Sequence, residues 1–294
     1  MTDERAVAPT LPNGITGTIQ ASLGHTLDEL ETQGHVGAHV VGLSTGHMGL
    51  DLLIGGLRND DLVVVGGPPG SGKTSFACSI VSAIGVTLDR PVLFLHPGQP
   101  RNQIVRRLLA LLSGVHLGQL DTGRLRTDAW TCIGTGVKRL ADSPIFLNDS
   151  LLLSAREVCD EARWLEAHRG LAIIVCDGIH LLWSDWKSEN RAITPNEIIV
   201  SLRILARQFG IPVLVTGRMS AGANLRPAGK PRISDLSDRQ VLEDADVILA
   251  LDQVLSGGTE TRITRVHCLK NRNGKTGVTH IERSEDGSYP WPSV

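Results

Sequence analysis

Aromatic residues and long apolar runs are scarce in this chain. Only 3% of its 294 residues are aromatic although 41% are hydrophobic, so a core must be built from Leu, Ile, Val and Ala. No run approaches the roughly 18 apolar residues that a membrane-spanning helix needs. The first ten residues carry charges and no apolar segment, which argues against a secretory signal. We therefore expect a cytoplasmic globular protein with no membrane partner.

Paired cysteine motifs and an excess of charge are also absent. The five cysteines are widely spaced and none forms a C-x-x-C pair, so the sequence predicts free thiols in a reducing compartment and no zinc site. The formal net charge is only −2, so the chain has no global basic signature. Contact with nucleic acid would then depend on local basic patches, or on several subunits that line a shared channel.

The most informative stretch is LVVVGGPPGSGKTSFA at residues 62–77. An apolar run leads into G-x-x-x-x-G-K-T and a helical pattern follows, which is the strand, loop and helix setting of a phosphate-binding loop. Glycines let backbone N–H groups converge on phosphate oxygens, and the helix N-terminus adds partial positive charge. A glycine turn followed by a chance Lys-Thr is the alternative. We expect the nucleotide to be bound by Gly67, Pro68, Pro69, Gly70, Ser71, Gly72, Lys73, Thr74 and Ser75.

Three residues carry the chemistry that we expect of this site. Lys73 should reach the β- and γ-phosphates, and the Thr74 hydroxyl should ligate Mg²⁺. The second carboxylate for Mg²⁺ is expected at the end of a buried strand, and Asp177 follows the apolar run Leu171–Cys176. The alternative is an aspartate that only terminates a strand before Gly178. The sequence thus predicts that the chain binds ATP or another nucleoside triphosphate together with Mg²⁺.

Short apolar runs alternate with helical patterns from Leu62 onward. This alternation predicts an α/β fold with a mainly parallel sheet that helices cover on both faces. Two β-branched segments, Arg265–Leu269 and Val278–Glu282, are separated by Asn-Gly and Thr-Gly and predict a C-terminal β-hairpin at the sheet edge. The other expected strands are 62–65, 92–95, 145–147, 171–176, 211–216 and 247–251, and the expected helices lie near 73–86, 101–113, 127–141, 154–168 and 195–208.

The N-terminal part differs from the rest of the chain. Residues 1–16 are polar and bear Pro and Gly, which predicts a disordered tail. Residues 17–43 hold an amphipathic helix and a loop, followed by the main domain at 44–294. The apolar stripe of that helix, formed by Ile19, Leu23, Leu27 and Leu30, needs a partner, which is either its own domain or another subunit.

Several further stretches, taken with the phosphate-binding loop, follow the order of one known family. They are STGHMGLDLLIGGL (44–57), VLFLHPGQPRNQIVRRLLA (92–110), IIVCDGIHLL (173–182), ISDL (233–236), EDAD (243–246) and LKNRNGKTG (269–277). This order resembles the RecA-like motor domain at the C-terminus of DnaB-type replicative DNA helicases. The resemblance covers about residues 17–283, and it implies a RecA-like P-loop NTPase fold. The N-terminal domain that usual members place before the linker helix is missing from the match.

The resemblance implies an ATP-dependent DNA helicase that acts in DNA replication. It implies a hexameric ring that hydrolyses ATP between subunits, moves on single-stranded DNA and contacts replication or loader proteins. Lys270 and Arg272 match the family's Lys-x-Arg, which reaches the γ-phosphate of the neighbouring subunit. A solvated hairpin face is the alternative for these two residues. The amphipathic helix at 19–33 resembles the family's linker helix, which docks on the next subunit.

The resemblance also places the DNA contacts. The segments 183–194 and 217–240 should face the channel of the ring, where charges repeated six-fold would track phosphates. Each charge taken alone is also consistent with an ordinary solvated surface residue. The residues expected to contact DNA are Arg226, Lys230, Arg232 and Arg239.

The sequence departs from the family at several catalytic positions. The family's water-activating glutamate falls on Gly98, and no carboxylate lies nearby. His96 or Gln99 could position water instead, although a plain loop is equally consistent. His180 stands where the family has a glutamine. Arg218 stands at the γ-phosphate sensor and keeps a hydrogen-bond donor there.

These departures leave two further functions open. One is a nucleotide-gated DNA-binding or assembly module with weak or no hydrolysis. The other is a RecA-like recombination or regulatory ATPase, which would form filaments rather than closed rings.

Overall fold

The chain divides into two units, Met1–Val41 and Gly42–Val294, in a computed structural model. The structure describes residues 19, 23, 27, 40–151, 153–182, 195–219, 230–236, 243–256, 259–284 and 288–289. In the first unit Ile19, Leu23 and Leu27 are helical, and 79, 53 and 58% of their surfaces are exposed. The second unit carries the sheet and every strand and helix named below.

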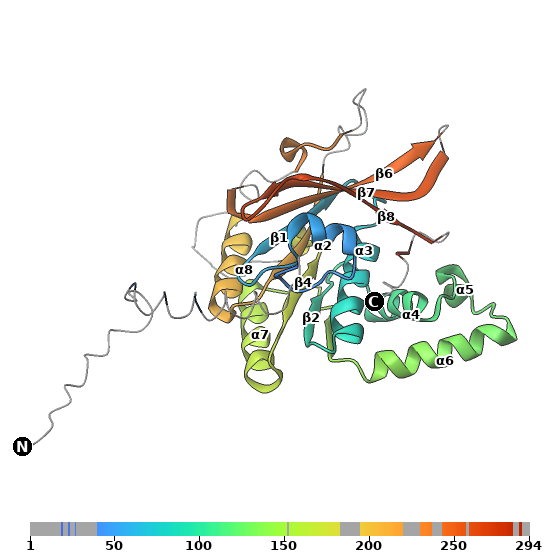
Figure 1. Cartoon of the computed structure of the whole chain (residues 1–294). Helices are drawn as coiled ribbons and strands as arrows, with labels where there is room; N and C mark the ends of the chain where they lie inside the picture. Colours follow the sequence, from blue (N-terminus) through green and yellow to red (C-terminus); the bar gives the residue numbers. More distant parts are fainter. Residues whose placement is uncertain are drawn as a thin grey trace, which may run out of the picture. The chain divides into compact units, whose positions relative to one another are not determined.

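An eight-stranded sheet forms the centre of the second unit (Figure 1). Its strand order is β3-β2-β4-β5-β1-β6-β7-β8. All pairings from β3 across to β6 are parallel, whereas β6 with β7 and β7 with β8 are antiparallel. The strands are β1 (Leu62–Gly67), β2 (Val92–Leu95), β3 (Ile145–Asn148), β4 (Ile173–Asp177), β5 (Val213–Arg218), β6 (Val247–Ser256), β7 (Thr259–Asn271) and β8 (Gly277–Glu282).

Helices cover both faces of the sheet, because successive residues of each buried strand point to opposite sides. On β1, Val63 and Val65 belong to one apolar core while Leu62 and Val64 belong to the other. The first core is closed by α2 (Met48–Ile54), α3 (Lys73–Ser82) and α4 (Arg101–Ser113). The second is closed by α7 (Ala155–Arg169) and α8 (Pro195–Phe209). This layered arrangement confirms the predicted α/β fold with a mainly parallel sheet.

Two short helices were not expected from the sequence pattern. They are α2 and α5 (Leu117–Thr122). The helix α6 (Thr127–Ala141) packs against α4, and a Cβ at Gly136 would come within 3.1 Å of Leu109 Cδ1. Gly136 therefore lets α6 pack closely against α4, because a side chain at this position would crowd Leu109.

The helix after the phosphate-binding loop differs from the expected 73–86. Its regular part ends at Ser82, and a π-helical turn covers Ala83–Thr87. A Cβ at Gly85 would lie only 2.3 Å from Ile145 Cγ1 on β3. The backbone of Gly85 in this turn therefore packs directly against Ile145 on β3, the strand at one edge of the sheet.

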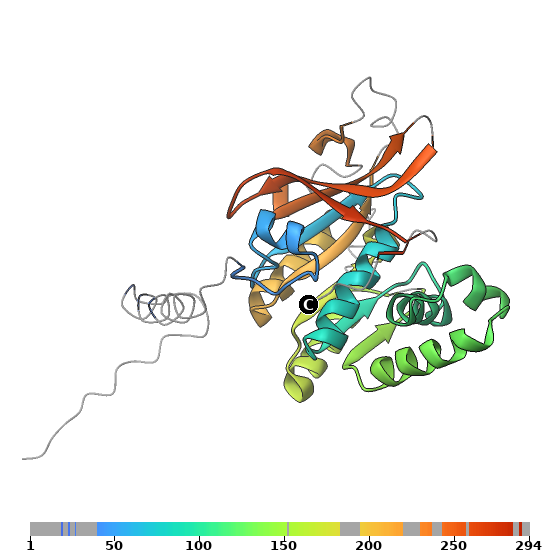
Figure 2. The same ribbon diagram turned by 45° about the vertical axis from the view of Figure 1, so that its right-hand side comes forward.

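The C-terminal strands form two successive antiparallel hairpins, drawn as long orange and red arrows in Figure 2. The expected hairpin is confirmed, with Cys268 opposite Gly277 and Ile263 opposite Glu282. The pairing of β6 with β7 was not expected, and the prediction that the earlier strand ends at Leu251 was wrong. Beyond Leu251, β6 continues from Asp252 to Ser256 because this outer part pairs with β7 along a ribbon rather than in the buried sheet.

The cysteines are free thiols, as their spacing in the sequence predicts. All five cysteines are free; Cys78, Cys176 and Cys268 are buried, and Cys132 is exposed. Burial raises the pKa of the Cys268 thiol to about 11, so it stays protonated near neutral pH. Within the described ranges, no helix combines the length and the apolar character that crossing a membrane requires.

Candidate nucleotide-binding site

The phosphate-binding loop lies between the end of β1 and the start of α3. Gly70 and Gly72 have φ angles of +80° and +88°, a region that side chains disfavour, so the turn requires glycine at both positions. The Ser71 N–H donates to the Pro68 carbonyl oxygen at 3.2 Å and closes the turn. A Cβ at Gly67 would lie 2.3 Å from Ser71 Oγ. The loop thus has the compact backbone that lets N–H groups face an anion.

Lys73 closes the loop with its own side chain. Its Nζ atom donates to the carbonyl oxygens of Gly67 at 2.8 Å and Pro68 at 2.9 Å. Burial lowers the pKa of Lys73, the nearby Asp177 carboxylate opposes that change, and the Arg218 charge adds to it. These partners are weak acceptors compared with phosphate oxygens. A bound triphosphate can therefore displace them.

Thr74 and Asp177 lie together as the sequence predicted. Thr74 Oγ1 donates to Asp177 Oδ2 at 2.6 Å. The other carboxylate oxygen accepts from Thr216 Oγ1 at 2.7 Å, and Thr216 in turn accepts from the Gly178 N–H at 2.8 Å. Asp177 is 8% exposed. Strands β4 and β5 are parallel neighbours, and their register places Asp177 beside Thr216.

This pair of oxygen groups fits Mg²⁺. Magnesium prefers oxygen ligands and is commonly held by one or two protein groups together with nucleotide phosphates and water. Within the described part of the chain, no group of three or more His, Cys, Asp or Glu side chains could hold a metal. A hydroxyl and a carboxylate at the mouth of a phosphate-binding loop suit a metal that arrives with the nucleotide.

Arg218 lies next to the loop from the other side. It ends β5, and the parallel register pairs it with Gly67 at the end of β1. Its charge also lowers the pKa of His180, for which burial is the larger cause, and Lys73 acts in the same direction. The fold thus brings Lys73, Asp177, Arg218 and His180 into one electrostatic neighbourhood.

The turn between β2 and α4 brings Gln99 into the site. Gln99 Nε2 lies 3.1 Å from Thr74 Oγ1. Gly98 sits beside it, and a Cβ there would lie 2.6 Å from Leu181 Cδ1, in the turn that follows Asp177. The position that lacks the expected glutamate is therefore at the site, and its neighbour supplies an amide.

The C-terminal part of the unit also contacts the loop, which sequence reasoning missed. Gln253 Nε2 on β6 donates to the Gly70 carbonyl oxygen at 2.9 Å. Tyr289, the only tyrosine in the chain, is fully buried, and its hydroxyl lies 3.4 Å from the position of a Cβ at Gly72. Its ring packs against His47 and Phe76. The pairing of β6 with β1 brings Gln253 beside the loop, and the segment after β8 contributes Tyr289.

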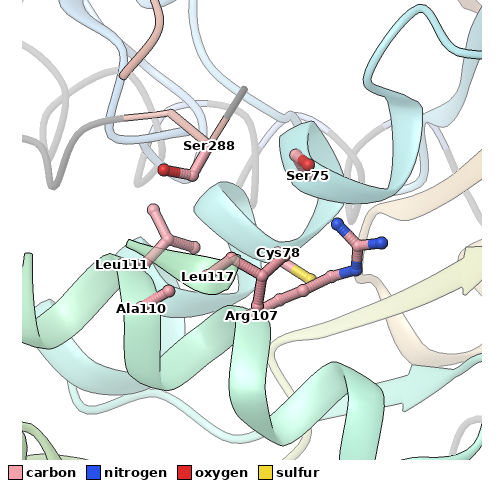
Figure 3. A pocket seen from close by; sticks show the side chains of 7 residues that line it. All are labelled: Ser75, Cys78, Arg107, Ala110, Leu111, Leu117 and Ser288. Atoms are coloured by element: carbon pink, nitrogen blue, oxygen red, sulfur yellow. The ribbon is translucent and has the colours of Figure 1, made fainter. Parts of the chain in front are cut away.

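A small pocket opens next to Ser75, at the first turn of α3 (Figure 3). Arg107 lines this pocket together with Cys78 and Ser75. Arg107 Nε is buried and has no hydrogen-bond partner among the residues that the structure describes. A cation beside the loop is a candidate contact for a nucleotide, and no motif pointed to it. The pocket is lined by Ser75, Cys78, Arg107, Ala110, Leu111, Leu117 and Ser288.

The sequence of the second unit matches one family model along most of its length. Residues 42–286 match the DnaB-like helicase C terminal domain. The chain belongs to this family. It is 32% identical over 274 residues to the replicative DNA helicase DnaB of Pasteurella multocida, covering 90% of this chain and 58% of that protein. The DnaB of Buchnera aphidicola is 31% identical over 248 residues, covering 82% of this chain and 54% of the relative. The chain thus spans between a half and three fifths of these relatives.

Solved structures confirm the RecA-like fold of this DnaB-like domain. One of them, described as an ATPase domain, has a TM-score of 0.85 at 21% identity, and the match covers 94% of this chain and 99% of that one. A DnaB-like replicative helicase described with its interactions with primase has a TM-score of 0.81 at 20% identity, covering 94% of this chain and 67% of that one.

In the DnaB-like domain, Lys270 and Arg272 lie far from the phosphate-binding loop of their own chain. Arg272 Nη1 lies 3.0 Å from Asp246 Oδ1, and the Arg272 N–H donates to the Asp246 carbonyl oxygen at 2.9 Å. Asp246 Oδ2 accepts from the N–H of Leu62, the first residue of β1. Since β1 rises about 3.3 Å per residue, its other end at Gly67 is about 16 Å away. The fold does not bring these two basic residues to Lys73 within one subunit.

The residues expected to contact DNA are only partly described in the DnaB-like domain. Lys230 and Arg232 are exposed, and the Arg232 N–H donates to Asp235 Oδ2 at 2.7 Å. Arg226, Arg239 and the segment 183–194 lie outside the described residues.

Proposed function

We propose that this chain is the ATP-dependent motor of a DnaB-type DNA helicase. The observation that carries the proposal is the joint placement of Lys73, Thr74 and Asp177 around one phosphate-binding loop, in a member of the DnaB-like family. The motor acts on single-stranded DNA during replication. Its units are a tail at 1–16, a linker helix and loop at 17–43, and a motor domain at 44–294.

The site supports binding and activation of a triphosphate. The residues of the loop from Gly67 to Ser75 surround the phosphates, and Lys73 exchanges its two carbonyl partners for the β- and γ-phosphate oxygens. Thr74 and Asp177 hold Mg²⁺, which neutralises charge on the phosphates when it is bound. Arg218 stands beside Lys73 and contacts the γ-phosphate.

Hydrolysis takes place between subunits of a ring, which we propose to be a hexamer. Arg272 and Lys270 are separated from their own loop by the length of β1, so they act on the nucleotide of the adjacent subunit. A positive charge supplied by a neighbour stabilises the transferring phosphoryl group. The exposed apolar side chains of Ile19, Leu23 and Leu27 give the linker helix a face for that neighbour.

DNA lies in the channel of the ring. Lys230 and Arg232 are exposed, which is consistent with phosphate contact, and Arg226 and Arg239 join them in the proposal. A solved relative was described together with primase, so a replication or loader protein is the kind of protein partner that we expect.

The proposal is tested by ATP turnover in the presence and absence of single-stranded DNA. Wild-type protein should hydrolyse ATP only with Mg²⁺, and DNA should stimulate turnover. Lys73→Ala should lose turnover, while Lys138→Ala, on the exposed face of α6, should retain it. A wild-type protein that forms rings on DNA without any turnover would exclude a motor.

A further inference from the structure

The turn between β2 and α4 holds Gln99 firmly by its backbone. The Gln99 N–H donates to the His96 carbonyl oxygen at 3.1 Å, and His96 Nδ1 lies 3.0 Å from the Gln99 carbonyl oxygen. Since a carbonyl oxygen can only accept, the proton must sit on Nδ1. Two hydrogen bonds therefore close the turn from His96 to Gln99, and Pro97 fixes one of its dihedral angles. The Gln99 side chain starts from a defined position.

The hydrogen-bond network also fixes the orientation of the Gln99 amide. The Thr74 hydroxyl has one proton, which it donates to Asp177 Oδ2. The contact of 3.1 Å with Gln99 must then be donated by Nε2 and accepted by Thr74 Oγ1. The amide nitrogen is thus tied to the residue expected to ligate Mg²⁺, and the amide oxygen points elsewhere.

That amide oxygen is left without a partner. Gln99 Oε1 is buried and accepts no hydrogen bond from the described residues. Native proteins rarely leave a buried acceptor unpaired, and such an atom often has a catalytic role. The glutamate that the family resemblance implies at this turn is replaced by Gly98. The unpaired acceptor of Gln99 and the absence of a carboxylate at Gly98 thus occur at adjacent positions of one turn.

We propose that Gln99 orients the water that attacks the γ-phosphate. This role rests on the proposed ATPase function and deepens it. Oε1 accepts a hydrogen bond from the water while Nε2 stays linked to Thr74. The water oxygen forms the new bond to the γ-phosphorus, the bond from that phosphorus to the bridging oxygen breaks, and the water proton leaves with inorganic phosphate. Gln99 gains no proton, because an amide positions water without acting as a base.

His96 is a positioning residue in this arrangement. Its ring is fully buried and packs edge-on against Phe94, with ring centroids 5.3 Å apart. The Nδ1 atom of this ring is used in the hydrogen bond to the Gln99 carbonyl oxygen, whereas the Gln99 side chain contacts Thr74 of the site directly. His96 therefore acts through the hydrogen bond that holds Gln99.

The experiment measures the affinity of the protein for two nucleotide complexes at equilibrium. Each complex displaces a fluorescent ADP from the site, and the displacement gives the affinity. ADP with aluminium fluoride imitates the transferring phosphoryl group with its attacking water, whereas ADP with beryllium fluoride imitates bound ATP. Gln99→Ala should weaken the aluminium fluoride complex by about tenfold or more, as expected for a group that acts in the transition state. The beryllium fluoride complex should change by less than about twofold. Gln103→Ala, an exposed glutamine at the start of α4, should alter neither affinity.

The outcomes separate this role from the proposed function. Equal weakening of both complexes would mean that Gln99 only supports the fold of the site, and no change in either would also overturn its role. ATP turnover is measured on the same samples. A wild type without turnover contradicts the proposed function, whereas wild-type turnover with an unchanged ratio of affinities in Gln99→Ala overturns the role of Gln99 alone.

Discussion

Thr216 connects two strands beside Asp177, the carboxylate that we propose as a Mg²⁺ ligand. Replacing it by Val keeps the shape but leaves one Asp177 oxygen and the Gly178 N–H without their partner. We expect Thr216→Val to lower the free energy of unfolding by about 1–3 kcal/mol. The Mg²⁺ concentration for half-maximal turnover should rise about tenfold or more, because a ligand has lost its support. Urea denaturation and a Mg²⁺ titration measure these two effects.

A threonine on the surface provides the control for this change. Thr135 is exposed on α6 and donates only to the Thr131 carbonyl oxygen of its own helix. Thr135→Val should change stability by less than about 0.5 kcal/mol and leave the Mg²⁺ dependence unaltered. If Thr216→Val behaved in the same way, Asp177 would not depend on its neighbour.

Asp61 is predicted to make stability depend on pH. Burial raises the pKa of this carboxyl from 3.8 to about 6, the Asp246 charge adds to the rise, and Arg58 opposes it. The folded state therefore binds the Asp61 proton more tightly than the unfolded state. The resulting stability is fully present below about pH 4 and is lost as pH rises through about 6.

The variant Asp61→Asn should remove this dependence. It keeps a group that can accept from Asn273 Nδ2, and it cannot ionise. Above pH 6 we expect it to be more stable than wild type by about 1–2 kcal/mol, with a flatter profile between pH 4 and 6. Urea denaturation across pH 4–8 measures this, with Asp121→Asn on exposed α5 as a control. An Asp61→Asn protein that is less stable than wild type at pH 7 would contradict the assignment.

At the residue scale, the sequence predicts side chains that belong to a local motif and misses those that depend on strand pairing. Lys73 and Thr74 follow from one loop, and Asp177 follows from the end of one apolar strand. Thr216 reaches Asp177 only because β5 lies beside β4 in a given register. Arg107 lines a pocket with Ser75 only because α4 packs beside α3.

At the scale of elements, the turn between β2 and α4 contains both Gly98, where the expected glutamate is absent, and Gln99, the group that we propose to position the attacking water. Gly98→Glu would push the new Cβ into Leu181 Cδ1, but Leu181 is 38% exposed and can turn away. If the site lacked any group to position water, the new carboxylate should raise turnover by about a hundredfold or more. Because Gln99 occupies that role, we expect a gain below about tenfold. Steady-state ATP turnover measures it.

A variant of matched size controls for the packing change. Gly98→Gln displaces Leu181 in the same way without adding a carboxylate, so any difference from Gly98→Glu reports the charge alone. A gain of a hundredfold that is confined to Gly98→Glu would show that the turn is a degenerate catalytic element.

Elements that follow from local pattern were predicted, and those that follow from packing were not. The mainly parallel sheet, the helices on both faces and the β7–β8 hairpin agree with apolar periodicity and turn residues. The outer half of β6 reads Asp-Gln-Val-Leu-Ser and lacks the continuous apolar run of the buried strands, and its Asp252 pairs with Arg265 on β7 at 2.6 Å. The π-helical turn at Ala83–Thr87 places Gly85 against Ile145 on β3, a contact that the local sequence does not reveal.

At the scale of the whole assembly, the proposed sharing of sites can be tested by mixing variants. Lys73→Ala and Arg272→Ala should each abolish turnover alone. In an equimolar mixture, about a quarter of the interfaces should pair an intact Lys73 with an intact Arg272 from the neighbour, so about a quarter of wild-type turnover should return. Mixing Lys73→Ala with the double variant should restore none. A mixture without recovered activity would place Arg272 outside the shared site.

The separation of the phosphate-binding loop from Arg272 by the length of β1 has a consequence for how activity grows with protein concentration. Each subunit carries a phosphate-binding loop at one end of β1 and Arg272 at the other, so subunits that share sites associate head to tail. Two such subunits form one complete site, and one loop and one Arg272 stay without a partner subunit. An open chain of subunits then always has one fewer working site than it has members, and only closure supplies the last one. Turnover per subunit should therefore climb with assembly length and stop rising once the ends meet.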